Sequence, residues 1–221
     1  WYKKAINILP TNASYHSNLA NTFTKIRDFK NAIYHHTISI EIDPNNASSH
    51  YNLANTYREN NEILNAIKFY KKSIMLNPSL AIAYYNLAIC HNHNGDSDSA
   101  IKAYQQCIQL EKNNSSAINN LANIFHKNGE IDKAIDHYKV AMKIDPNSAE
   151  ILTNLSYLYL LNGDYAEGLR LHEFRSLKTI DPSKPNAYPK CKKLKKIEDI
   201  GGKSILLVTE QGLGDTLQFI R

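Results

Sequence analysis

Apolar, small and polar positions recur along this chain with a period of 34 residues. The repeat is clearest in the string Asn-Leu followed by Ala or Ser, which begins five times, at Asn18, Asn52, Asn86, Asn120 and Asn154. A fixed period of this length is typical of a solenoid, in which each repeat is one supersecondary unit that packs on its neighbours. The pattern therefore predicts a row of stacked repeats, a form that presents an extended surface.

Each repeat holds two stripes of core positions at helical spacing. If position 1 of the first repeat is Ala13, positions 4, 7, 8 and 11 form one stripe, and positions 17, 20, 21, 24 and 28 form the other. The pattern predicts an all-α solenoid over residues 1–182, with two antiparallel helices in each repeat. Residues 1–12 supply half a unit, and the repeats span 13–46, 47–80, 81–114, 115–148 and a degenerate 149–182.

Turn residues separate the two stripes. Three repeats carry a glycine at position 15, where a left-handed residue can end the first helix: Gly95, Gly129 and Gly163. An acidic residue follows each glycine, and negative charge is favourable at the N-terminus of the next helix. Prolines at position 32 bias the preceding residue away from helix. They predict that second helices end near Asp43, Asn77 and Asp145.

The pattern resembles the tetratricopeptide repeat over residues 1 to about 182. The resemblance rests on Leu at position 7, an aromatic residue or His at position 11, a small residue at position 20 and Pro at position 32. The first-helix Trp and Gly of the family pattern are absent. The resemblance implies helix pairs stacked into a right-handed superhelix, with the first helices lining an inner, concave wall.

Asparagine occupies position 6 in all five repeats, one residue before the core Leu. Because Asn is a mediocre helix former, its presence at one phase in every repeat indicates a role. A carboxamide offers both a donor and an acceptor, so a column of them could hold an extended segment by its backbone. We expect a protein or peptide partner in this groove, whose predicted residues are Asn18, Asn52, Asn86, Asn120, Asn154, Asn21, Asn55, Asn123, Tyr51 and Tyr85.

This column is similar to the asparagine ladder in the repeat domain of O-linked N-acetylglucosamine transferases. The alternative is that the carboxamides bond within or between neighbouring helices, or that the chain is simply rich in Asn. Mixed charges at position 13 disfavour a clamp for an acidic C-terminal tail. If the ladder binds a partner, replacing Asn52, Asn86 and Asn120 together by Ala should weaken binding and leave the fold intact.

The first helix of the fifth repeat is apolar almost all round, from Ile151 to Leu161. Such a helix must be covered on both sides. Positions that face the groove in other repeats have become Tyr157, Leu160 and Leu161. We therefore expect residues 149–182 to pack on a following domain of the same chain.

Composition narrows the functional classes. The net charge of +5 arises in the Pro- and Lys-rich linker expected at 183–203, which argues against nucleic acid because a binder would spread basic residues over a folded face. No apolar run reaches the ~18 residues of a membrane span, so no membrane partner is expected. Three scattered cysteines favour reduced thiols and a cytoplasmic location. No metal site is expected, because His91 and His93 do not share a helix face.

The last residues change character. Ser204 to Thr209 is a short β-branched, apolar run that predicts a buried parallel strand. A Gly-rich turn and a helical segment follow, so residues 204–221 read as the start of an α/β domain whose ligand crevice lies at the strand's carboxyl end. Asp215 follows Gly214, and its role is either a helix cap or a functional group.

Residues 163–221 look like the junction in bacterial glycosyltransferases that carry tetratricopeptide repeats fused to a two-lobed GT-B region. That resemblance implies Asp215 as the catalytic base and Gly212 and Gly214 as the substrate loop. It also implies a nucleotide-sugar donor for the full-length enzyme, with no cofactor bound by residues 1–221, which we expect to be an inactive fragment. The alternative is a stand-alone repeat scaffold without catalytic activity.

Overall fold

The computed structural model describes the backbone of residues 1–179 and the side chains of 1–172, apart from that of Lys3. Within this part the regular structure is entirely α-helical, and no strand occurs. The chain divides into two compact units, residues 1–178 and 179–221, of which the first is the subject of the description below. The predicted linker at 183–203 and the predicted start of an α/β domain at 204–221 lie outside the described residues.

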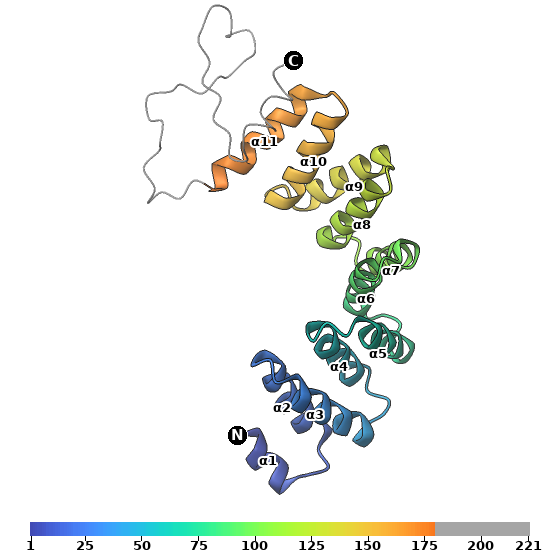
Figure 1. The fold of residues 1–221 in the computed structure, drawn as a ribbon, viewed down its shortest axis with the longest axis vertical. Helices are drawn as coiled ribbons and strands as arrows, with labels where there is room; N and C mark the ends of the chain where they lie inside the picture. Colours follow the sequence, from blue (N-terminus) through green and yellow to red (C-terminus); the bar gives the residue numbers. More distant parts are fainter. Residues whose placement is uncertain (180–221) are drawn as a thin grey trace, which may run out of the picture. The chain divides into compact units, whose positions relative to one another are not determined.

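Helix α1 (Tyr2–Ile8) is followed by five helix pairs, one in each repeat (Figure 1). The two helices of a pair pack on each other, and the second helix of a pair packs on the first helix of the next. The fold is therefore a helical-repeat solenoid. The pairs are α2 (Ala13–Lys25) with α3 (Phe29–Ile42), α4 (Ala47–Glu59) with α5 (Ile63–Leu76), α6 (Ala81–His93) with α7 (Ser97–Leu110), α8 (Ser115–Lys127) with α9 (Ile131–Ile144), and α10 (Ala149–Leu161) with α11 (Tyr165–Thr179).

The helix ends follow the turn chemistry predicted from the sequence. Gly95, Gly129 and Gly163 have φ of +80°, +81° and +83°, and Arg27 and Asn61 adopt the same left-handed conformation at position 15 of the first two repeats, with φ of +63° and +62°. The second helices end where the prolines predict, with C-caps at Asp43, Asn77 and Asp145.

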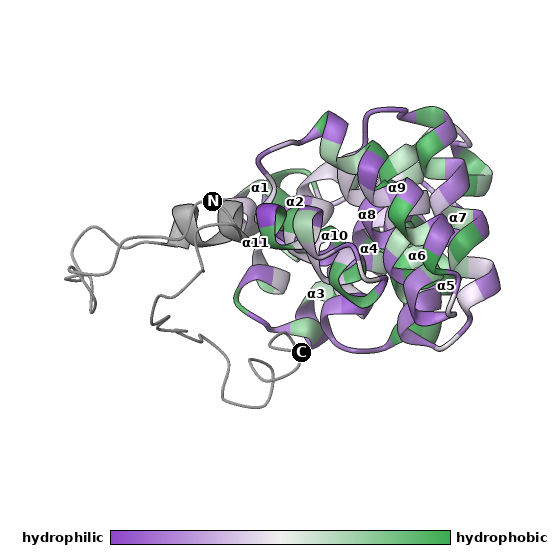
Figure 2. Cartoon of the chain, turned by 90° about the horizontal axis from the view of Figure 1, so that it is seen from above, coloured by the Kyte–Doolittle hydropathy of each residue, from purple (hydrophilic) through white to green (hydrophobic). Residues whose placement is uncertain are grey.

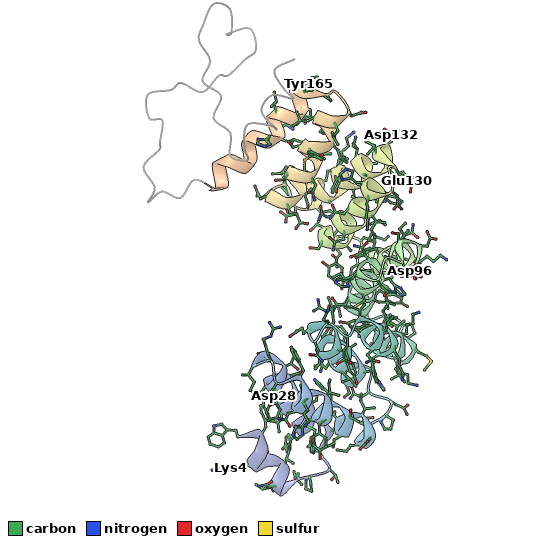
Figure 3. All side chains as sticks on the ribbon, in the orientation of Figure 1. Lys4, Asp28, Asp96, Glu130, Asp132 and Tyr165 are labelled. Atoms are coloured by element: carbon green, nitrogen blue, oxygen red, sulfur yellow. The ribbon has the colours of Figure 1, made fainter. Side chains whose placement is uncertain are left out.

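Acidic residues begin the second helices, as the labels of Asp28, Asp96 and Glu130 show in Figure 3. The carboxylates of Asp28 and Asp96 accept hydrogen bonds from backbone N–H groups of the first turn, whereas Glu130 makes no such cap bond. Four of the five first helices are capped in the same way, by the side chains of Asn12, Asn46, Asn114 and Ser148. These caps satisfy backbone donors that have no partner inside the helix.

A small residue at position 20 lets the two helices of each pair approach closely. The alanines at this position, Ala32, Ala66, Ala100 and Ala134, are fully buried. In the last pair a Cβ on Gly168 would lie 2.7 Å from the Leu160 side chain, and the Ser156 hydroxyl donates to the Gly168 carbonyl at 2.8 Å. Polar and apolar residues alternate along the helices, as Figure 2 shows, because one side of each faces the shared core.

The structure corrects the expectation for one of the three apolar residues of α10. Leu160 was expected to face the groove, but it is 9% exposed and packs against Gly168. Tyr157 and Leu161 are 52% and 58% exposed, as predicted for apolar residues at these positions. Packing of this repeat on a following domain stays a prediction, since that domain lies outside the described residues.

Position 24 differs between the first repeat and the next three. Tyr70, Tyr104 and Tyr138 fill this position in the second, third and fourth repeats and are almost fully buried. In the first repeat it holds His36, which is 0% exposed and whose two ring nitrogens have no hydrogen-bond partner in the described part of the chain. Burial, with a smaller contribution from the neighbouring His35, lowers the pKa of His36 from 6.5 to about 4.

We therefore predict that the first repeat loses stability in mild acid. The unfolded chain binds a proton at His36 below about pH 6.5, and the folded chain binds it only near pH 4, so stability falls as the pH falls through this window. Between pH 7 and pH 5 the loss should be about 2 kcal/mol. Hydrogen exchange of the amides in α2 and α3 measures it.

The His36→Tyr variant should remove this pH dependence, because it restores the residue that the next three repeats carry. Its hydroxyl should also reach Asn21, as Tyr70 reaches Asn55 at 2.6 Å one repeat further on. His93→Tyr is the control, since His93 is exposed and its replacement should leave the pH dependence unchanged. An unchanged pH dependence in His36→Tyr would contradict the assignment to His36.

Candidate functional site

The position 6 asparagines lie at the contact between the first helices of successive repeats. Asn18, in the first repeat, is exposed, Asn86 is buried, and the other three are half-buried. Four of them donate a side-chain N–H to a residue at position 5 of the preceding repeat. The Nδ2 to acceptor distances are 3.4 Å from Asn52 to Ser17, 2.9 Å from Asn86 to Tyr51, 3.2 Å from Asn120 to Tyr85 and 3.3 Å from Asn154 to Asn119.

Position 9 joins the same bonds where it is Asn. The Asn55 Oδ1 accepts from the Tyr70 hydroxyl at 2.6 Å and from Asn86 Nδ2 at 3.4 Å. The Asn123 Oδ1 accepts from the Tyr138 hydroxyl and from Asn154 Nδ2, the latter at 3.2 Å. In the third repeat this position is Ile89, so the pattern is interrupted there.

We call these residues at positions 5, 6 and 9 of the first helices the carboxamide seam. Four of the five asparagines therefore hydrogen bond between neighbouring helices, which was the alternative to a ladder used only for binding. One side-chain N–H of each is committed to the preceding repeat, which orients the carboxamide. In the described part of the chain, the Oδ1 atom of Asn52 accepts no hydrogen bond, so it is an acceptor that a partner could use, whereas the Asn120 carboxamide interacts with both Tyr85 and Tyr104.

The predicted groove residues are brought together, with differences between repeats. Tyr51 and Tyr85 are half-buried and serve as acceptors in the seam. Asn21 is half-buried and its neighbour at position 24 is His36 instead of Tyr. Burial raises the pKa of the Tyr85 hydroxyl, while Asn120, Glu150 and Arg58 make smaller contributions of mixed sign. The Tyr85 phenol is therefore a neutral hydrogen-bonding group at physiological pH.

A hollow of about 90 Å³ lies on the seam between the third and fifth repeats. Tyr85, Asn119, Asn120 and Glu150 are among its lining residues. Asn119 Nδ2 donates to the Glu150 carboxylate at 2.7 Å, so this end of the seam carries a negative charge. Position 2, which is Glu150 in the fifth repeat, is Ser in three of the others, so no period along the chain predicts a charge there.

Arg58 at position 12 is a second seam neighbour that sequence reasoning missed. Position 12 holds Thr, Arg, Asn, His and Leu in successive repeats, so no period marks it. Arg58 shares a face of α4 with Tyr51 and Asn55, which precede it by seven and three residues, and its charge acts on the titration of Tyr70, Tyr85 and Cys90. It therefore places a positive charge on the seam at the second and third repeats.

The other residues considered in the sequence analysis lie away from the seam or outside the described residues. His91 is buried, with its Nδ1 at 3.1 Å from the Asp96 carboxylate, whereas His93 is exposed. Among the described residues no cluster of three or more His, Cys, Asp or Glu side chains could ligate a metal ion. No described helix is both long and apolar enough to span a membrane. Asp215, Gly212 and Gly214 lie outside the described residues.

Solved structures with the same fold support this architecture. The chain is similar to the crystal structure of MamA protein, at 25% identity and a TM-score of 0.68 over 75% of this chain and 91% of that one. It is also similar to YrrB, described as a TPR protein with an unusual peptide-binding site, at 18% identity and a TM-score of 0.66 over 81% and 93%. Pseudomonas aeruginosa pilF gives 20% identity and a TM-score of 0.71 over 83% and 82%. No curated protein sequence matches the chain.

We predict that Asn86→Ala destabilises the solenoid by about 1–3 kcal/mol, because it removes a buried side chain and leaves its half-buried partners Tyr51 and Asn55 each one hydrogen bond short. Asn18→Ala should change stability by less than about 0.5 kcal/mol, because Asn18 is exposed. Urea unfolding of the two variants gives the comparison. Equal stabilities would show that the seam does not hold the repeats together.

This prediction revises the expectation that replacing three seam asparagines leaves the fold intact. Asn52, Asn86 and Asn120 each bond to the preceding repeat, so the triple variant should lose stability as well as any bound partner. Binding tests therefore need variants in which the seam bonds persist.

Sequence models of known protein families match parts of this chain. The tetratricopeptide repeat model matches residues 47–80 and 81–114, which are the second and third repeats as counted here. A second tetratricopeptide repeat model matches residues 103–136, and a TPR repeat model matches residues 122–163. Together they cover residues 47–163, more than half of the 221 residues. With its five helix pairs at a 34-residue period, the chain belongs to the tetratricopeptide repeat family.

Proposed function

We propose that the repeats hold an extended polypeptide of a partner protein along the carboxamide seam. The observation that carries the proposal is that four successive repeats present the same group, an Asn side chain, with its N–H committed to the preceding repeat. Binding of protein or peptide partners is the usual role of tetratricopeptide repeats. The partner's own backbone N–H groups would meet the carbonyl oxygens of the carboxamides.

The seam bonds favour such binding because they restrict the carboxamides before a partner arrives. An Asn side chain free in solvent loses rotamer freedom when it binds, whereas Asn120, already bonded to Tyr85, loses less. Groups that are pre-organised in this way bind more tightly for the same contacts. A contact to the partner's backbone does not distinguish one partner side chain from another, so selectivity must come from other residues beside the seam.

Proton-detected NMR tests the proposal directly. Peptides selected from a random library displayed on phage would be added to the full chain, and the side-chain carboxamide signals would be followed. We predict shifts at Asn52, whose Oδ1 atom accepts no bond in the described part of the chain, and at Asn120, whose carboxamide is oriented by its bond to Tyr85. The carboxamide of Gln105, exposed on the second helix α7, is the matched control and should stay unchanged.

Two results would contradict the proposal. One is the failure of any library peptide to shift the seam carboxamides. The other is a set of shifts confined to the second helices, which would place the partner on the opposite surface. The fold is reported in the same spectra by the backbone amides, so a loss of binding through unfolding is recognised at once.

We further propose that these repeats form the N-terminal part of a glycosyltransferase that uses a nucleotide-sugar donor. This rests on the likeness of residues 163–221 to the junction in repeat-containing glycosyltransferases, with Asp215 as base and Gly212 and Gly214 as substrate loop. The alternative is a scaffold without catalysis. Reading the gene past Arg221 separates them: several hundred further residues with alternating strands and helices support the enzyme, and an immediate stop codon overturns it.

A further inference from the structure

Arg58 occupies an unusual position for a charged side chain. It lies in the last turn of α4 and is only half-exposed, and its Nε is fully buried without a hydrogen-bond acceptor. No Asp or Glu forms an ion pair with it in the described part of the chain. The carbonyl end of the α4 helix dipole offers some compensation, which is small at a helix terminus.

The other two arginines with described side chains have partners. Arg170 donates from both Nε and a terminal nitrogen to the Glu167 carboxylate, with 2.7 Å from Nε to the carboxylate oxygen. Arg27 is exposed and stacks over the Phe29 ring at 5.7 Å. The donors of the exposed Arg27 can meet water, whereas Arg58 is the one arginine among the described side chains with an N–H, that of Nε, buried without an acceptor.

In the described part of the chain, the Arg58 charge acts on Tyr70 and Cys90, which are neutral groups. Burial raises the pKa of the Tyr70 hydroxyl and raises that of the Cys90 thiol to about 11, while the Arg58 charge opposes both shifts. Neither group is a counter-ion at physiological pH. Tyr70 already donates its own proton to Asn55, so it can offer Arg58 only an acceptor lone pair. An unpaired, partly desolvated guanidinium is costly, and a carboxylate placed beside it would remove that cost.

We propose that Arg58 is the anion-binding subsite of the carboxamide seam and takes the side-chain carboxylate of an Asp or Glu in the bound polypeptide. This inference rests on the function proposed above and adds a selectivity element to it. The guanidinium fork matches a carboxylate with two parallel hydrogen bonds. The seam that holds the backbone and the charge that selects a side chain are then adjacent.

The location favours an internal acidic residue over a free C-terminus. Arg58 lies in the second repeat, and seam asparagines continue on both sides, at Asn18 before it and at Asn86, Asn120 and Asn154 after it. A bound polypeptide that follows the seam therefore extends beyond Arg58 on both sides. A phosphate group is disfavoured because its charge of about −2 is usually matched by a cluster of arginines. Here the second charge that acts on Tyr85, together with Arg58, is the acidic Glu150.

The Nε–H signal of Arg58 in a ¹H–¹⁵N NMR spectrum tests the proposal residue by residue. It is assigned by its disappearance in the Arg58→Gln variant of the full chain. Three alanine-rich peptides are added at up to millimolar concentration. The first has blocked ends and one central Glu, the second has Gln in its place, and the third carries its only carboxylate at a free C-terminus.

We expect the Glu peptide to shift the Arg58 signal and to bind about tenfold more tightly than the Gln peptide, as a charge-assisted pair should. The advantage should shrink at high salt. In Arg58→Gln the Glu and Gln peptides should bind equally. Arg27→Gln removes the same charge from an exposed site and should leave the tenfold preference intact.

Equal binding of the Glu and Gln peptides overturns the proposal, as does an Arg58 signal that none of the peptides moves. A shift caused only by the peptide with the free C-terminus overturns the choice of an internal residue. These outcomes are separate from a failure of the proposed function. A library peptide that shifts the Asn52 and Asn120 carboxamides but binds Arg58→Gln unchanged would support seam binding and contradict the role of Arg58.

Discussion

Each helix pair of this protein depends on the next pair to cover it. A unit of 34 residues is too small to bury its apolar stripe alone, so the core exists only where neighbouring repeats stack. Within each of the first four pairs, a fully buried alanine at position 20 lets the two helices approach, because any larger side chain would hold them apart. The tyrosines at position 24 fill the remaining space in the core. The hydroxyls of Tyr70 and Tyr138 donate hydrogen bonds to Asn55 and Asn123.

The carboxamide seam follows from that stacking. Once the first helices of neighbouring repeats are in contact, position 6 of one meets position 5 of the repeat before it. Asparagine meets Ser, Tyr, Tyr and Asn there in turn, and each supplies an acceptor. In the proposed function, stability and binding share the same side chains: one end of the carboxamide holds the repeats together, and the other end would face a partner. Arg58 and Glu150 add charges of opposite sign to this surface.

Much of the fold could be predicted from the sequence because its signals are local. A 34-residue period, helical stripes and a Gly or Asn at the turn act within one repeat, so they survive without knowledge of the neighbours. The left-handed Arg27 was missed because arginine rarely takes that conformation and carries no turn signal. Leu160 was placed on the groove side because every side of α10 is apolar, and a uniform helix does not reveal which face is covered.

The sequence by itself determined the repeat, its length, its helix pairs and the column of asparagines. Only the tertiary structure decided what those asparagines do, because a hydrogen bond between Asn86 and Tyr51 joins residues 35 positions apart and depends on how two helices lie side by side. The same holds for Arg58 and His36, whose character comes from the groups around them. That Arg58 has no counter-ion and His36 no hydrogen-bond partner among the described residues is a property of packing, and no pattern along the chain records it.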